Sequence, residues 1–219
     1  MGPLSVRDRG KASFRVFLVI CLLSSMFWMN YVNRAHAEPA SGKPGLIEDF
    51  ESYADDEALR QAWTEAWSDK PGSVARALGQ ASGSQGLELS AAIADSEWAN
   101  IAYSIPSDKR DWSLFDGLSF WVDNTTNDNK AFSLNVALQT PAAKGEFGLK
   151  EGGTALTIAA DGSWQTAAFG GSSLLIPAGF QGVVSISWDQ FVQSAWQCDG
   201  VQADCAAELD AGEVTGLQV

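Results

Sequence analysis

The chain has 219 residues, of which 46% are hydrophobic and 19% are charged, so it can bury the core of one sandwich- or barrel-sized domain and is not globally disordered. Its formal net charge is −13. A surface of that sign repels nucleic acid and anionic lipid. The composition therefore favours a neutral ligand or a cation as the partner.

The first 37 residues have the features of a secretory signal. Basic residues precede an apolar run at 16–29, and residues 35–37 give a small-x-small cleavage sequence. We expect cleavage at that point, then a linker at 38–45 and one domain at 46–219, whose last strand is either truncated or the edge of the domain. The cleaved protein is expected to be periplasmic or extracellular and free of the membrane. An uncleaved membrane anchor is the alternative.

The domain is predicted to open with a strand at 46–53, followed by a helix that begins around Asp55. Acidic residues in the first turn favour this start, because they face the positive end of the helix dipole. Apolar residues at spacings of three and four continue the helical pattern, and they are Leu59, Ala62, Trp63, Ala66 and Trp67.

The rest of the chain consists of short segments in which apolar and polar residues alternate, separated by turns rich in Gly, Pro and Asp. The Asp161-Gly162 turn predicts a hairpin between two of these segments. In total the pattern predicts about nine or ten strands, which is typical of an all-β sandwich. After the helix, the predicted strands are 86–93, 98–105, 118–122, 132–139, 154–158, 163–169, 174–176, 182–186 and 214–219.

Trp121 is the first candidate for ligand binding. Alternation in the strand 118–122 directs Leu118 and Phe120 to the core and leaves Trp121 on the opposite face. Indole rings stack on the apolar faces of sugars, while amides bind sugar hydroxyls. The alternative is that Trp121 is covered by the helix or by a loop.

Three further residues are expected beside Trp121 on the non-core face. Asn135 and Gln139 come from the next predicted strand, and Tyr103 joins them if its strand lies in the same sheet. Three other tryptophans, Trp63, Trp67 and Trp98, are expected to be structural.

The cysteines and the histidine limit the chemistry. The single histidine, His36, lies in the leader, so the domain contains no catalytic histidine and no histidine metal ligand. Carboxylate chemistry such as glycoside hydrolysis remains open, because it needs two acids. Cys198 and Cys205 are predicted to form a disulfide that closes a small loop, and zinc is not expected there.

Four acids are candidates for calcium ligation, because hard cations take carboxylate oxygens. They are expected to meet where the first and last strands of the domain come together, and the alternative is that they are ordinary loop acids. These residues are Asp49, Glu51, Asp116 and Asp210.

Three segments resemble the family 11 carbohydrate-binding modules of secreted glycoside hydrolases. They are LIEDFESY at 46–53, DWSLFDGLSFWV at 111–122 and IPAGFQG at 176–182. The resemblance implies a two-sheet, galactose-binding-like jelly roll with a polysaccharide-binding face and structural calcium.

Together these observations predict an all-β, two-sheet antiparallel jelly-roll sandwich with one short N-terminal helix. The expected function is non-catalytic binding of a β-glucan-like polysaccharide, with a linked or associated glycoside hydrolase as a partner and no nucleic acid. The alternatives are a small carboxylate-dependent glycoside hydrolase or lyase on the same fold, and a protein-interaction or envelope scaffold domain.

Overall fold

The structure is a computed structural model, and it describes residues 19–22, 45–68, 72–81, 84–91, 98–126, 130–141, 146–193, 197–198, 205 and 208–219. Apart from 19–22 and 45, the predicted leader and linker lie outside the described residues. Among the residues that are described, no helix has the length and apolar character needed to cross a membrane.

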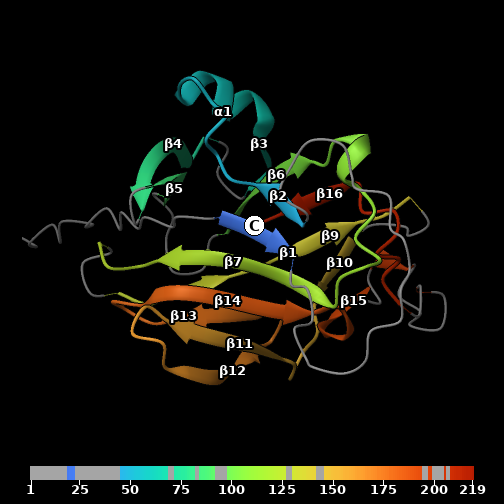
Figure 1. Ribbon diagram of the computed structural model, residues 1–219. Helices are drawn as coiled ribbons and strands as arrows, with labels where there is room; N and C mark the ends of the chain where they lie inside the picture. Colours follow the sequence, from blue (N-terminus) through green and yellow to red (C-terminus); the bar gives the residue numbers. More distant parts are fainter. Residues whose placement is uncertain are drawn as a thin grey trace, which may run out of the picture.

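The predicted all-β sandwich is confirmed: two antiparallel sheets form the body of the molecule, together with one short α-helix (Figure 1). The larger sheet has the order β2-β1-β7-β14-β11-β12-β13-β8. Its strands are β1 (Val19–Leu22), β2 (Leu46–Glu48), β7 (Gly117–Asp123), β8 (Phe132–Leu134), β11 (Thr154–Ala159), β12 (Trp164–Gly170), β13 (Ser173–Ile176) and β14 (Gln181–Ser187).

The smaller sheet has six strands in the order β15-β10-β9-β16-β6-β3. They are β3 (Trp63–Ser68), β6 (Ala99–Ser104), β9 (Ala137–Gln139), β10 (Glu146–Leu149), β15 (Phe191–Gln193) and β16 (Gly216–Gln218). A separate hairpin of β4 (Val74–Ala81) and β5 (Ser84–Ala91) lies beside the helix α1 (Asp56–Ala62). Two 3₁₀ turns, η1 (Ser107–Lys109) and η2 (Trp188–Gln190), complete the elements.

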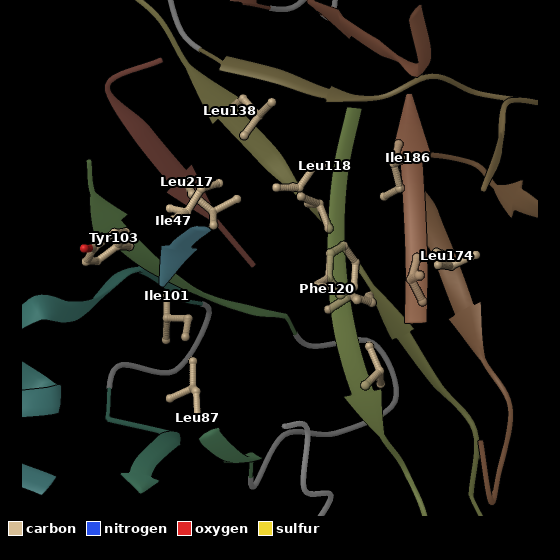
Figure 2. Packing of buried hydrophobic residues seen from close by; sticks show 14 of the residues in the cluster. Ile47, Leu87, Ile101, Tyr103, Leu118, Phe120, Leu138, Leu174, Ile186 and Leu217 are labelled. Atoms are coloured by element: carbon tan, nitrogen blue, oxygen red, sulfur yellow. The ribbon is translucent and has the colours of Figure 1, made fainter. Parts of the chain in front are cut away.

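The hydrophobic core lies between the two sheets. On β7, Leu118 and Phe120 are buried while Trp121 turns away from the core, as alternation predicts. Figure 2 shows these two β7 side chains beside Ile186 of β14, with Leu138 and Leu217 of the smaller sheet on the facing side. Burial of apolar surface across this interface is the main favourable contribution to folding.

The first predicted strand is shorter than expected. It ends at Glu48, because Phe50 adopts a φ of 63°, a left-handed conformation that breaks an extended strand. The Phe50 side chain is fully buried, and its backbone N–H donates to the Glu48 carboxylate at 2.9 Å. These contacts hold the turn in place.

The helix begins as predicted and ends early. Asp55 caps it, since its carboxylate accepts a hydrogen bond from the backbone N–H of Ala58 at 2.9 Å. The helix stops at Ala62, and Trp63 starts the strand β3. The predicted helical stripe is therefore wrong beyond Ala62. The fully buried Trp63 instead stacks on Tyr103 with ring centroids 4.9 Å apart, a contact that the extended backbone makes possible.

One predicted strand is divided between the two sheets. The segment 132–139 forms β8 in the larger sheet and β9 in the smaller one, and Asn135 lies in the connection between them. The apolar alternation of this segment continues through the crossover, because Leu134, Val136 and Leu138 are all buried in the shared core. Alternation alone therefore gives no sign of the change of sheet.

Strand β1 falls inside the predicted leader. It lies between β2 and β7, with Val19 paired to Trp121 and Ile20 paired to both Phe120 and Glu48. Cleavage after residue 37 would remove β1 from the sheet. The chain therefore either keeps β1 in the sheet or loses it with the leader.

The segment that leads into β7 is fixed by two tryptophans. Trp112 donates from its indole Nε1 to the carbonyl of Lys109 at 2.6 Å and stacks on Trp188 at 5.9 Å. Trp188 in turn donates from Nε1 to the carbonyl of Phe115 at 2.6 Å. These contacts join the entry of β7 to the end of β14, which gives Trp188 a structural role.

Candidate functional site

The outward face of the six-stranded sheet carries a polar surface that we call the amide face. Cross-strand partners share a face, and Tyr103, Leu217 and Leu138 form one core-facing row across β6, β16 and β9. The alternate residues therefore point outward. Those of the amide face are Thr64, Asn100, Ala102, Ser104, Ala137, Gln139, Glu146, Gly148, Gly216 and Gln218.

Gln139 lies at the centre of the amide face. It is paired with Gly216 on one side and with Glu146 on the other. A Cβ at Gly216 would lie 2.5 Å from the Oε1 atom of Gln139, so the Gln139 amide extends across β16 over the bare backbone of this glycine. Thr215 fixes the Gln139 carbonyl oxygen, which accepts from the Thr215 N–H at 2.8 Å. The glycine thus makes room for the amide group.

A second amide pair lies on the neighbouring strands. Asn100 donates from Nδ2 to the Oε1 of Gln218 at 3.5 Å. Gln218 is buried, with 3% of its surface exposed, whereas Asn100 is only partly buried. Gln218 therefore orients the Asn100 amide from beneath.

Glu146 brings a carboxylate to the edge of this amide group. Burial raises the pKa of Glu146, because desolvation disfavours the charged form. Among the strand residues of the amide face that the structure describes, Glu146 is the only ionisable side chain. The described strand positions of the face are therefore nearly neutral and offer amide donors and acceptors.

An exposed tryptophan lies beside the amide face. Trp98 immediately precedes β6, and 47% of its surface is exposed. It has the same parity as Asn100 and Ala102, which point outward. Trp98, which was expected to be structural, is therefore not buried in the core. Alternation in 98–105 contained the signal, because the core position of Tyr103 leaves Trp98 on the opposite face.

The four predicted ligand-binding residues do not gather on one face. Gln139 lies on the amide face, and Asn135 is exposed in the β8–β9 connection. Trp121 is partly buried on the outward face of the eight-stranded sheet, on the opposite side of the molecule from Gln139. The expectation of neighbouring strands fails because β8 and β9 belong to different sheets.

Tyr103 is a core residue. It is buried against Trp63, and burial raises the pKa of Tyr103, with a further increase from the nearby Glu48 carboxylate. The same carboxylate accepts a hydrogen bond from the Tyr53 hydroxyl at 2.9 Å. Burial raises the pKa of Tyr53 as well, and the negative charge of Glu48 raises it further. The Tyr53 hydroxyl therefore satisfies one oxygen of the buried Glu48 carboxylate.

The four predicted calcium ligands each lie in a local backbone turn or loop. Asp49 accepts from the Glu51 N–H, Glu51 accepts from the Gln85 N–H, and Asp210 accepts from the Gly212 N–H. Asp116 is exposed before β7. Within the described part of the chain, no three His, Cys, Asp or Glu side chains are grouped closely enough to hold a metal ion. This acid set therefore does not fit a single calcium site.

Cys198 and Cys205 form the predicted disulfide, with their Cα atoms 5.2 Å apart. This bond closes a short loop after β15 and before the segment that leads into β16. The prediction of a loop-closing disulfide is confirmed.

The family model for a carbohydrate binding domain (family 11) matches residues 33–168, which is more than half of the chain. The match includes Trp98, Asn100, Gln139 and Glu146 of the candidate site and ends within β12. No curated protein matches the chain.

Proposed function

Because the chain belongs to carbohydrate-binding domain family 11, we propose that it is a non-catalytic module that binds a neutral, β-glucan-like polysaccharide along the amide face. Trp98 stacks on the apolar face of a sugar ring at one side of this surface. The amides of Asn100 and Gln139 donate hydrogen bonds to sugar hydroxyls and accept hydrogen bonds from them. The Glu146 carboxylate accepts hydrogen bonds from sugar hydroxyls.

The arrangement of Gln139 over Gly216 carries this proposal. A side chain at that glycine would occupy the position of the Gln139 amide. The bare backbone thus leaves room for the partly buried Gln139 amide beside the side chains of the neighbouring strands. A nearly uncharged surface of this kind, on a chain of net charge −13, suits a neutral ligand that offers many hydroxyls.

Membership in this family favours binding over catalysis, and the face itself supports that reading. Glycoside hydrolysis by the usual route needs two carboxyl groups on either side of the scissile bond. Glu146 is the single carboxylate among the described strand residues of the amide face. In this proposal a linked or associated glycoside hydrolase performs the chemistry, and the module holds it on the polysaccharide.

Export and calcium belong to the same proposal. The Cys198–Cys205 disulfide supports an oxidising compartment such as the periplasm or the extracellular space. Calcium is proposed only as a structural ion implied by the family resemblance, and no step of binding depends on it.

Affinity electrophoresis through gels that contain hydroxyethyl cellulose, a soluble β-glucan, tests the proposal. We expect the chain to be retarded, and the Trp98→Ala and Gln139→Ala variants to be retarded less. Leu114→Ala is the control, because Leu114 is an exposed apolar residue of a turn outside the amide face, with 74% of its surface exposed.

Equal mobility with and without glucans of several linkages would refute glycan binding and favour the scaffold alternative, in which a protein partner co-purifies. Release of reducing sugar, lost when Glu146 is changed to Gln, would favour the enzyme alternative. Parallel gels with a chelator test calcium, since a calcium-dependent fold loses its retardation there.

A further inference from the structure

The outward face of the eight-stranded sheet carries a row of apolar side chains in one register, which we call the tryptophan row. β7, β14, β11 and β12 are consecutive in this sheet (Figure 1). Trp121 pairs with Val183, Val183 with Ile158, and Ile158 with Trp164. Cross-strand partners lie on the same face, so these four side chains form a continuous line.

Much of the tryptophan row is exposed. Trp164 has 72% of its surface exposed and Ile158 has 37%, while Val183 and Trp121 are partly buried. Leu156, at 39% exposure, adds to the row from the next register position. Three strand spacings separate the two indoles, which corresponds to roughly 14 Å along the row. An apolar strip of this length on a soluble chain indicates a contact surface.

The strand positions that share a face with the tryptophan row carry little charge. Among the strand residues of β7, β14, β11 and β12 that share this face, Asp123 is the one ionisable residue. Its carboxylate is occupied, because it accepts from the Thr125 hydroxyl at 2.6 Å and from the Gln181 amide at 2.9 Å. Ser119 and Ser185 of this face are buried and hydrogen-bonded to each other at 2.8 Å. Its exposed hydroxyl residues are Thr154, Thr166 and Ser187.

Exposed apolar side chains with few charges around them favour a neutral partner. Nucleic acid, anionic lipid and a second copy of the chain are all disfavoured by the net charge of −13, since like charges repel during approach. Sugar rings have apolar faces that stack on indoles and hydroxyls that pair with serine and threonine. The row offers indole rings and hydroxyl groups on one side of a sheet. A sheet face of this kind fits several parallel sugar chains better than one chain enclosed in a groove.

We propose that the tryptophan row is a second carbohydrate-binding surface, which adsorbs the chain to the flat surface of an insoluble β-glucan. It takes the ligand class from the proposed function but uses the opposite side of the molecule from the amide face. The amide face binds single soluble chains, and the tryptophan row binds packed chains.

Adsorption isotherms on microcrystalline cellulose test this proposal, because this solid and hydroxyethyl cellulose share one backbone and differ in presentation. We expect Trp164→Ala to lower the partition constant about tenfold, the upper range for loss of a stacked aromatic contact. Ile158→Thr, which keeps a β-branched residue in the strand, should lower it by a smaller factor. Leu114→Ala is the control for an exposed apolar residue elsewhere and should adsorb normally.

The two faces are separated by comparing both assays. Trp164→Ala should retain full retardation by hydroxyethyl cellulose, and Trp98→Ala should be retarded less. Equal adsorption of Trp164→Ala and the unmodified chain, or failure of the unmodified chain to adsorb, would overturn the second surface. If the chain is retarded by the soluble glucan in that case, the proposed function stands.

Sedimentation velocity tests whether the tryptophan row is instead an interface between two copies of the chain. We expect a monomer for both the unmodified chain and Trp164→Ala. A dimer that dissociates in the Trp164→Ala variant would identify the row as a surface between two copies and would overturn the carbohydrate assignment.

Discussion

Replacement of Gly216 by Ala tests whether the Gln139 amide is positioned for binding. The added Cβ would lie 2.5 Å from the Oε1 atom of Gln139 and 3.2 Å from its Cδ. The far end of a flexible side chain can rotate away at little cost, so the fold should be kept. The amide, however, must leave its place across β16.

The expected effect on binding is moderate. Loss of one intermolecular hydrogen bond costs about 1 kcal/mol, which corresponds to a roughly fivefold increase in Kd for a soluble β-glucan. Isothermal titration calorimetry of both proteins measures this ratio, and a urea denaturation curve for each shows whether the domain has kept its stability. We expect the two denaturation midpoints to differ little.

Gly148→Ala is the matched control. Gly148 lies on the same face in β10, and a Cβ there would meet no heavy atom within 4 Å. This variant should bind as the unmodified chain does. Unchanged affinity in Gly216→Ala, with the domain folded, would refute the role of Gln139. Equal losses in both variants would show that any added methyl group disturbs the face.

Three further predictions concern stability. Trp63→Ala should lower the free energy of unfolding by about 3–5 kcal/mol in urea, because it empties a fully buried aromatic site; a loss below about 1 kcal/mol would contradict this packing. Glu146 has a raised pKa in the folded state, so the folded state binds its proton more tightly and the chain loses stability as the pH rises above the ordinary glutamate pKa of about 4.3. Glu146→Gln should therefore gain stability relative to the unmodified chain between acidic and neutral pH, and parallel pH profiles would refute the assignment. A chain that begins at residue 38 lacks β1, which pairs along four residues with β7, and should unfold at lower urea concentration; equal midpoints would show that β1 adds nothing to the domain.

Local patterns were sufficient to predict several elements. The Asp161-Gly162 turn joins β11 to β12 as predicted, with Gly162 at a φ of 84°. Alternation correctly placed Trp121 opposite the core face of β7. Each of these features is set by residues close together in the sequence, so the pattern of the segment contains the information.

Three strands after β3 were missed because their local signals are weak, and one of them, β15, has only three residues. The strand β4 contains Ala, Gly and Arg and was not predicted, because its extended form depends on pairing with β5 along its whole length. The strand β10 has four residues, too few for alternation to be recognised.

The candidate site depended on information that the sequence pattern does not hold. Residues share a face only if their strands are neighbours, and strand order is set by long-range pairing. The predicted site combined Trp121 with Gln139, whose strands lie in different sheets. The pairing of Gln139 with Gly216, across more than seventy positions of the chain, is not visible in either segment alone.

The role of one glycine also differs from its sequence interpretation. Gly117 follows Asp116, and an Asp-Gly pair is typical of a turn. It lies within β7, where a Cβ would come 2.4 Å from the carbonyl oxygen of Ile186. The glycine is required there because two backbones approach closely. A sequence pattern marks the glycine but does not distinguish the two reasons for it.

An NMR titration of the isotopically labelled chain with soluble hydroxyethyl cellulose oligosaccharides tests the central claim most directly, because it locates the ligand on the molecule. We predict that the shifted signals cluster on β6, β9, β10 and β16, with the side-chain amides of Asn100 and Gln139 and the indole of Trp98 among them. Shifts confined to β7, β14, β11 and β12, or no shifts at saturating oligosaccharide, would contradict the assignment of the amide face as the polysaccharide-binding site.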